Sequence, residues 1–211
     1  MPTPSDLFLS PDLTETEARE YLATLGFRDA AGADEHLQAM ADDVRVRETL
    51  GHIAGDLLPA LTESPDPDAA VVGLSRYLAA RTGRAMFLDY LGDDPRAMHV
   101  LTYVLGASPF LSEILIRNPE YFHWLVSQIE RSAPDRRDLE DEILAMLANI
   151  ADPAEALDTL KRWKRRETLR IATRDLLRRE TVETATTQIS DLADVVVDCA
   201  LKIVTAPMMA D

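Results

Sequence analysis

The amino-acid sequence predicts an all-α protein, either a multi-helix bundle or an array of helical hairpins whose helices begin with proline. Three observations lead to this prediction. Cap residues followed by proline recur along the chain, apolar residues are spaced three and four apart, and the alternating pattern of half-buried strands is absent. From these signals we expect about 9 or 10 helices.

The first helix is expected to begin at a capping box. Thr14 can accept a hydrogen bond from the backbone of Glu17, and the Glu17 carboxylate can reach back to the amide of Thr14. Gly26 is placed to end this helix, because glycine adopts the left-handed conformation of a helix terminus without strain. Residues 1–13 are then an N-terminal tail.

Later helices mostly begin with a cap residue followed by proline, whose missing amide proton has no acceptor at the first helical position. The five pairs are Asp66-Pro67, Asp94-Pro95, Ser108-Pro109, Asn118-Pro119 and Asp152-Pro153. Three glycines, Gly83, Gly92 and Gly106, fall where helix ends are needed. A further break is expected at residues 178–181.

Apolar spacing within these segments is typical of helices that bury one face. Residues 63–68 and 131–138 interrupt the pattern, and both segments are short enough to be turns between helices. We therefore expect one helical domain over residues 14–205, with lobes 14–130 and 135–205 as an alternative. Residues 206–211 are expected to be a C-terminal tail or an interrupted linker. Three groups carry the spacing: Leu57, Leu58 and Leu61; Val71, Val72, Leu74 and Leu78; and Val100, Leu101, Val104 and Leu105.

Composition indicates a soluble cytoplasmic protein. The 211 residues are 46% hydrophobic and 28% charged, which is ordinary for a globular chain. A formal net charge of -15 argues against binding to nucleic acid or an anionic membrane, because phosphates would be repelled. The single cysteine, Cys199, excludes an internal disulfide, and we find neither a signal peptide nor an apolar run long enough to span a bilayer.

Positive charge is concentrated in one segment of this acidic chain. Residues 161–180 hold nine basic side chains and three acidic ones. Five arginines recur every four residues, so they form a row that winds slowly around a helix with apolar residues on both flanks. Such a helix is expected to be central. The five are Arg162, Arg166, Arg170, Arg174 and Arg178.

Two explanations of the basic helix are open. The protein's own acids can balance it, because Glu167 is spaced to pair with Arg170, and Asp175 with Arg178 or Arg179. Alternatively, part of the row contacts a neighbouring domain, an acidic partner or a nucleotide phosphate, groups that the arginine fork suits. The residues that we single out for an interdomain or anion contact are Arg162, Lys164, Arg165, Arg166, Arg170 and Arg174.

No catalytic or metal-binding motif is evident in the sequence. Asp66 and Asp68 form the one D-x-D pair ahead of a helix, but the proline between them indicates a turn and cap. Residues 190–194, SDLAD, lie in an amphipathic helical pattern, and the four histidines lack metal-ligand spacing. The aromatic segment 121–124 is expected to pack into the core with one exposed edge. We expect no catalytic residues, metal or cofactor in this chain.

Several phrases, taken together, resemble the helical regions of the bacterial bifunctional glutamine synthetase adenylyltransferase/adenylyl-removing enzyme. The most specific part is the basic helix followed by an LSDLAD-like helix. The resemblance covers most of residues 25–201. The segments are LGFRD (25–29), LLPALTESPDPDAAVVGLSRYL (57–78), LGASPFLSEILIRNPEYFHWL (105–125), LKRWKRRETLRIATRDLL (160–177) and QISDLADVVVDCAL (188–201).

The resemblance implies that a nucleotidyltransferase domain follows such a helical region, with a G-K-L-G-G stretch and an Asp-x-Asp metal site. The family's enzyme has two such units, which attach and remove AMP on glutamine synthetase under control of the PII signal protein and glutamine. This sequence ends at Asp211, where that domain is expected to begin, so no catalytic residue is carried over. Magnesium and ATP or ADP are expected only for that domain, and a start at Met1 favours the adenylyl-removing unit.

On this basis we expect a helical scaffold or regulatory portion of a glutamine synthetase adenylyltransferase that is not catalytic alone. Its expected partners are the nucleotidyltransferase domain, with glutamine synthetase and PII as further candidates. Two alternatives are open: a free-standing helical module that binds an unrelated protein, and a helical enzyme with a buried acid site.

Overall fold

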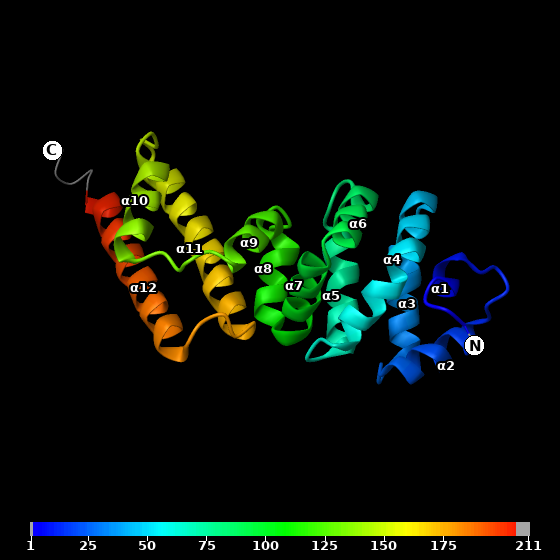
Figure 1. Ribbon diagram of the computed structural model, residues 1–211. Helices are drawn as coiled ribbons and strands as arrows, with labels where there is room; N and C mark the ends of the chain where they lie inside the picture. The colour runs from blue at the N-terminus through cyan, green and yellow to red at the C-terminus, as the bar shows by residue number, and fades with distance from the viewer. Residues whose placement is uncertain (1, 206–211) are drawn as a thin grey trace. The chain divides into compact units, whose positions relative to one another are not determined.

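The protein is all-α, as the sequence predicts. A computed structural model describes residues 2–205, which contain twelve helices and no strand (Figure 1). Residues up to Phe122 form one compact unit, unit 1, and residues from His123 form a second, unit 2. Four of these twelve helices begin at a proline, and the other eight do not. The first helix, Asp6–Leu9, lies within residues 1–13, which were expected to be a tail.

Unit 1 contains the helices from α1 to α8 and the start of α9, and unit 2 contains the rest of α9 and three longer helices. The bounds in unit 1 are α1 (Asp6–Leu9), α2 (Glu15–Leu25), α3 (Ala30–Met40), α4 (Val44–Thr62), α5 (Pro67–Ala79), α6 (Arg84–Asp93), α7 (Pro95–Ala107) and α8 (Pro109–Arg117). The remaining bounds are α9 (Tyr121–Ile129), α10 (Arg136–Leu147), α11 (Pro153–Leu176) and α12 (Val182–Thr205).

The predicted helix starts are mostly confirmed. Thr14 Oγ1 accepts from the amide of Glu17 at 3.3 Å, and the Glu17 carboxylate accepts from the amide of Thr14 at 3.0 Å, which completes the capping box. α5, α7, α8 and α11 each begin at the expected proline, after an aspartate or serine cap whose side chain accepts a backbone amide. These caps satisfy amide groups that have no partner within the helix.

The start expected at Asn118-Pro119 differs, because α9 begins at Tyr121. Asn118 instead ends α8, where its side-chain amide donates to the carbonyl of Ile114 at 2.8 Å. The Pro119 carbonyl accepts from the hydroxyl of Tyr77 at 3.0 Å and from Arg81 at 2.8 Å. Tyr77 of α5 and Arg81, which follows that helix, therefore hold this turn.

The glycines divide into two groups. Gly26 ends α2 with φ +110°, as predicted, whereas Gly83 has φ +67° and precedes α6. Gly92 and Gly106 lie inside the last turns of α6 and α7 rather than beyond them. A Cβ at Gly106 would lie 2.6 Å from Ser64 Oγ, so this glycine allows two chain segments to approach closely.

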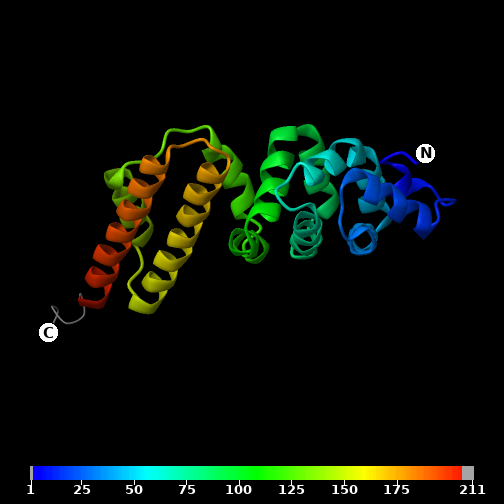
Figure 2. The same cartoon turned by 90° about the horizontal axis from the view of Figure 1, so that it is seen from below.

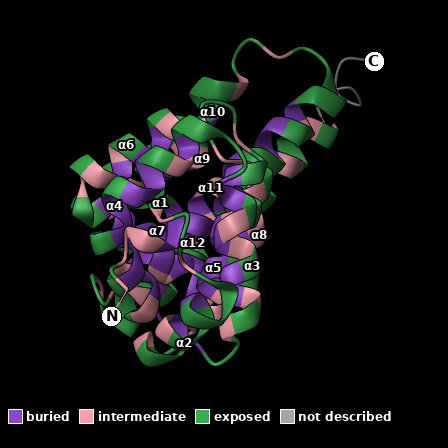
Figure 3. Cartoon of the chain, turned by 90° about the vertical axis from the view of Figure 1, so that its right-hand side faces the viewer, coloured by how far each residue is buried: buried purple, intermediate pink, exposed green. Residues whose placement is uncertain are grey.

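Unit 1 has a leucine-rich core with an aromatic cluster. The rings of Tyr77 and Phe87 are 5.5 Å apart, and Phe122 lies 5.6 Å from Phe87 in an edge-to-face arrangement. Arg81 lies 4.0 Å above the Phe87 ring. Phe122 is therefore a core residue, as expected for one member of the aromatic segment. The buried residues lie in stripes along the helices, with exposed residues on their outer sides (Figure 3).

Unit 2 is built around the antiparallel pair α11 and α12, which lie side by side (Figure 2). α10 packs against both helices. The turn between α11 and α12 falls at the predicted break, where Arg178 adopts a left-handed φ of +52°. The buried apolar cluster of unit 2 comprises Leu139, Ile143, Leu160, Trp163, Ile171, Leu192, Val195 and Cys199.

No helix within residues 2–205 is both long and apolar enough to cross a membrane. The SDLAD segment, residues 190–194, lies within α12 as expected. The tail predicted for residues 206–211 lies outside the described residues.

Candidate functional site

The basic helix α11 divides into an exposed part and a buried part. Arg162, Lys164 and Arg165 are exposed, Arg166 is half-buried, and both Arg170 and Arg174 are buried. The six residues singled out from the sequence are thus not equivalent. Their assignment to an interdomain or anion contact stays a prediction, and the buried members also have structural partners within unit 2.

Arg170 is the centre of a buried polar network. Its exposed fraction is 2%, equal to that of Glu167, and its Nε donates to Glu167 Oε2 at 2.7 Å. The Arg170 Nη1 donates to Gln188 Oε1 on α12 at 2.7 Å. This pairing of Glu167 with Arg170 is the one that their spacing predicts, and it is now joined to a second helix.

Arg174 joins α11 to the end of α9. Its Nη1 donates to the backbone carbonyls of Gln128, Ile129 and Arg131 at 2.9, 2.7 and 2.6 Å. Carbonyls at a helix C-terminus lack partners within the helix and carry partial negative charge, so a guanidinium is favourable there. The Arg174 Nε also donates to the carboxylate of Glu180. The other oxygen of that carboxylate accepts from the side-chain amide of Gln188.

Arg166 extends the network to α10. Its Nη2 donates to Glu142 Oε1 at 2.7 Å and to Glu167 Oε1 at 3.2 Å. The indole of Trp163 donates to the other oxygen of Glu142 at 2.7 Å. The Arg166 guanidinium also lies 4.3 Å above the ring of Trp124. We refer to Glu142, Arg166, Glu167, Arg170, Arg174, Glu180 and Gln188 as the arginine network.

The arginine network explains why the positive charges of this part of α11 are tolerated. Desolvating a charge costs several kcal/mol, roughly, unless counter-ions and hydrogen bonds replace water. Glu142, Glu167 and Glu180 supply that replacement from three different segments. Arg170 Nη2 and Arg166 Nε are nevertheless buried without a hydrogen-bond partner among the described residues. A polar cavity of about 460 Å³ adjoins the network, lined in part by Trp124, Glu142, Glu167 and Arg170.

Sequence reasoning found only part of this network. Glu142, Glu180 and Gln188 were missed because they lie on other segments, and local spacing reports only pairs within one helix. The sequence also predicted that Asp175 pairs with Arg178 or Arg179. In the structure, Arg179 instead lies 3.1 Å from the carboxylate of Glu130. A polar Gln188 among the apolar residues of α12 was the one available signal, because buried amides need partners.

The exposed residues of α11 form a separate basic surface. We define Lys161, Arg162, Lys164 and Arg165 as the basic patch. Lys161 Nζ lies 3.0 Å from the exposed carboxylate of Asp158, and Arg162 donates to Thr159 Oγ1 at 3.0 Å. The Lys161–Asp158 pair is exposed and contributes little to stability.

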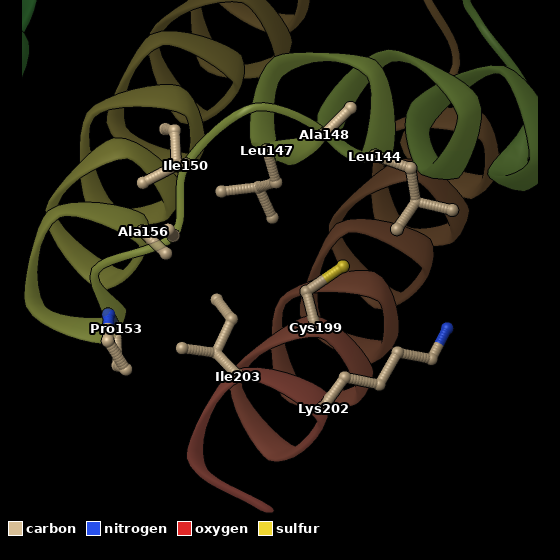
Figure 4. Close-up of a pocket in the computed structure, with 10 residues that line it drawn as sticks. Leu144, Leu147, Ala148, Ile150, Pro153, Ala156, Cys199, Lys202 and Ile203 are labelled. Carbon is tan, nitrogen blue, oxygen red and sulfur yellow. The ribbon is translucent and has the colours of Figure 1, made fainter. Parts of the chain in front are cut away.

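An apolar pocket lies at the end of the α11–α12 pair that is opposite the turn joining the two helices. Its volume is about 490 Å³, and its walls come from the end of α10, the start of α11 and the end of α12. In Figure 4, Leu147 and Ile203 point toward its centre. Lys202 is the one charged side chain among the described lining residues, and its Nζ lies 3.4 Å from Glu140.

Cys199 also lines this pocket. Burial raises the pKa of its thiol, so the thiol stays protonated at neutral pH and is a weak nucleophile. Among residues 2–205, no group of three His, Cys, Asp or Glu side chains is placed to hold a metal ion. Unit 2 thus has three distinctive features: a buried ionic network, a basic patch and an apolar pocket.

Comparisons with known proteins point to one family. Residues 98–211 match the family model described as glutamate-ammonia ligase adenylyltransferase. A bifunctional glutamine synthetase adenylyltransferase/adenylyl-removing enzyme of Leifsonia xyli is 34% identical over 81% of this chain and 17% of its own length. Proteins of the same name from Corynebacterium efficiens and Corynebacterium glutamicum are 30% and 29% identical, over 90% and 92% of this chain. The chain spans only 17–18% of the length of these relatives.

Proposed function

The chain belongs to the glutamate-ammonia ligase adenylyltransferase family, and on that premise we propose that it is a helical supporting portion of a glutamine synthetase adenylyltransferase. In this role it contributes no catalytic group of its own. It holds the part of the enzyme that carries out AMP transfer or removal in a productive position relative to glutamine synthetase.

One observation carries this proposal: the same helix that stabilises unit 2 also carries an exposed basic surface. The buried half of α11 fixes the helix through the arginine network. The exposed half then presents the basic patch on a rigid element. A surface on a fixed helix positions a partner more accurately than one on a loop.

The charge distribution favours contact with an acidic protein surface. The chain carries 37 acidic and 22 basic residues, so the basic patch is a local exception on an acidic chain. Arginine and lysine on such a patch speed the approach of a negatively charged surface and orient it. The rest of the enzyme, glutamine synthetase and the PII signal protein are the candidate partners. Magnesium and ATP or ADP belong, in this proposal, to the part of the enzyme that carries out AMP transfer.

A chimera of the Leifsonia xyli enzyme tests the proposal. The matched region would be deleted from that enzyme and, in a second version, replaced by this chain. We expect deletion to lower AMP attachment to or removal from glutamine synthetase by about tenfold or more, and replacement to restore much of it. A deletion variant as active as the intact enzyme would contradict a supporting role and favour a separate interaction module.

A matched pair of variants then separates contact from folding. Lys164→Gln with Arg165→Gln removes exposed charge, whereas Arg166→Gln with Arg170→Gln removes charge from the arginine network. The first pair should lower activity in the chimera without lowering the melting temperature. The second pair should lower the melting temperature of unit 2. Equal loss of stability in both pairs would indicate that the basic patch is structural.

A further inference from the structure

A polar cavity in unit 2 adjoins hydrogen-bond donors that the arginine network leaves without an acceptor. Its volume of about 460 Å³ is within the range of small-molecule sites, and its walls come from the end of α9, residues 131–134, α10 and α11. Both Arg170 and Glu167 line this cavity, although each is only 2% exposed. Deeply buried charged groups therefore form part of its wall, and we call it the Arg170 cavity.

The Arg170 guanidinium is only partly satisfied by the arginine network. Its Nε donates to Glu167 and its Nη1 to Gln188, each at 2.7 Å, but its Nη2 has no partner among residues 2–205. The Nε of Arg166 is also buried without a partner among those residues. A buried N–H group without an acceptor lowers stability, and the cost is greater when the group is charged. An oxygen acceptor in the cavity would remove that cost at Arg170.

The acidic side chains of the cavity wall are already engaged with donors of the protein. Glu167 accepts from two arginines, one at each oxygen, and the two oxygens of Glu142 accept from Arg166 and the Trp163 indole. The Asp138 carboxylate accepts a backbone amide at 3.1 Å in the capping box of α10. The donors left over on this wall therefore need an oxygen from outside the arginine network.

Arg131 adds a second guanidinium to the wall of the cavity. It follows α9 and is exposed, and its backbone carbonyl, rather than its side chain, bonds to Arg174. The guanidinium fork suits a carboxylate, because two parallel N–H groups match its two oxygens. A buried donor and an exposed guanidinium on one cavity together favour a ligand with a negatively charged oxygen.

The rest of the wall indicates the size and charge of that ligand. Trp124 and Leu139 supply apolar surface beside the charged groups, and the volume is many times the roughly 30 Å³ of one water molecule. Three carboxylates also line the cavity, those of Asp138, Glu142 and Glu167, and they disfavour a second negative charge on the ligand. The walls thus favour a monoanion with an apolar body over a phosphate dianion.

We propose that the Arg170 cavity binds a small organic monocarboxylate with an aromatic or aliphatic body. One carboxylate oxygen accepts from the Arg170 Nη2, and Arg131 pairs with the other. The body of the ligand packs against Trp124 and Leu139. The proposal rests on unit 2 alone and is independent of the supporting role proposed above.

Four small probes test the proposal on the whole chain by calorimetry and by tryptophan fluorescence, since Trp124 lies in the cavity wall. They are benzoate, hexanoate, the neutral benzamide and inorganic phosphate. We expect benzoate or hexanoate to bind at one site with a Kd of about 1 mM or lower. Benzamide and phosphate should bind about fivefold more weakly or worse. If neither carboxylate binds saturably, or if benzamide or phosphate binds as tightly, the proposal is overturned and water satisfies the Arg170 Nη2.

Three single variants locate the carboxylate. Ala133→Phe fills the cavity from its wall and should weaken binding about tenfold or more. Arg131→Gln removes the exposed guanidinium and should weaken binding about threefold, the effect of an exposed ion pair. Arg96→Gln makes the same change in net charge at an exposed position of unit 1 and should leave binding unchanged. Equal effects of the two arginine variants, or full binding by Ala133→Phe, would place the carboxylate elsewhere and overturn the proposal.

A combined replacement tests the role of Arg170 itself. Glu167→Leu, Arg170→Met and Gln188→Leu together remove the buried guanidinium with its partners, so no buried charge is left uncompensated at this point. Carboxylate binding should fall about tenfold or more while thermal melting shows a folded chain. Full binding by the folded triple variant would overturn the proposal, and if the triple variant does not fold, Ala133→Phe and Arg131→Gln decide.

The outcome is separable from that of the supporting role. If a carboxylate binds as expected but the Leifsonia xyli chimera is not restored, the cavity assignment stands and the supporting role fails. If the chimera is restored and neither carboxylate binds, the role stands and the cavity assignment fails.

Discussion

Units 1 and 2 bury different kinds of polar group. In unit 1 the buried polar residues are mainly hydroxyls that bond to nearby carbonyls, as Ser112 does to Leu105 at 3.1 Å and Thr102 does to Met98 at 3.1 Å. In unit 2 the buried set includes Glu167, Arg170 and Arg174. Unit 1 thus satisfies its buried polar groups locally, whereas unit 2 satisfies them between helices.

The difference shows how each unit specifies its packing. Unit 1 has many buried leucines and an aromatic cluster, so its helices are fixed by the fit of apolar side chains. Unit 2 has a small apolar cluster, and the arginine network adds directional bonds between α9, α10, α11 and α12. We infer that ionic bonds determine the alignment of helices in unit 2. The predictions below test this contrast, beginning with the largest expected effect.

Glu167→Gln should give the largest loss of stability. The change keeps the shape of the side chain but leaves Arg170 buried without its counter-ion, which costs about 3–5 kcal/mol. Both tryptophans, Trp124 and Trp163, lie in unit 2, so tryptophan fluorescence during urea unfolding reports on this unit alone.

A combined apolar replacement sharpens the same contrast. Glu167→Leu, Arg170→Met and Gln188→Leu together remove the buried charges with their partners, so stability should change by less than about 2 kcal/mol relative to the unmodified chain. Urea unfolding followed by tryptophan fluorescence measures it. A loss as large as that of Glu167→Gln would show that the charges contribute net stability.

Gly106→Ala should destabilise unit 1 by about 1–3 kcal/mol through overpacking. The new Cβ would lie 2.6 Å from Ser64 Oγ and 2.9 Å from the carbonyl of Asp66. Far-UV circular dichroism should show an earlier transition while tryptophan fluorescence is unchanged. Gly55→Ala is the matched control, because its Cβ would meet nothing within 4 Å and helix propensity favours alanine.

Asp34→Asn should stabilise unit 1 slightly, in a way that depends on pH. Burial raises the pKa of the Asp34 carboxyl from its ordinary value of 3.8, and Arg19 offsets only part of that rise. A raised pKa in the folded state means that this carboxyl favours folding when protonated and disfavours it once ionised. The melting temperature of Asp34→Asn should therefore exceed that of the unmodified chain at pH 7, with the difference vanishing as the pH falls below about 3.8. A gain that persists unchanged at low pH would contradict this account.

Lys164→Gln with Arg165→Gln should have the smallest effect on stability, less than about 0.5 kcal/mol, because both side chains are exposed. Urea unfolding followed by tryptophan fluorescence measures the free energy of unfolding of this double variant, for comparison with that of Glu167→Gln. A large loss would place these residues in the arginine network and remove the distinction between the two halves of α11.

The helices could be predicted from the sequence because their signals are local. Caps such as Asp66-Pro67 and Asp152-Pro153 act within one turn and are independent of tertiary packing. The short helix α1 had no such signal; its Leu7 and Phe8 are buried by tertiary contacts. Gly106 was read as a helix end because its actual role, a close approach to Ser64, depends on a distant segment.

The candidate site was predictable in composition but not in arrangement. The unusual charge of residues 161–180 identified α11 from sequence alone. Which arginines are buried depends on Glu142 and Gln188, whose positions follow from the packing of α10 and α12.

The most direct measurement of the central claim is the rate of glutamine synthetase modification by the Leifsonia xyli chimera carrying Lys164→Gln and Arg165→Gln, at a temperature where unit 2 is folded. If the buried half of α11 builds the unit and the exposed half contacts a partner, this rate should fall about fivefold or more while unfolding is unchanged. An unchanged rate, or a loss that follows the loss of folded protein, would contradict the claim.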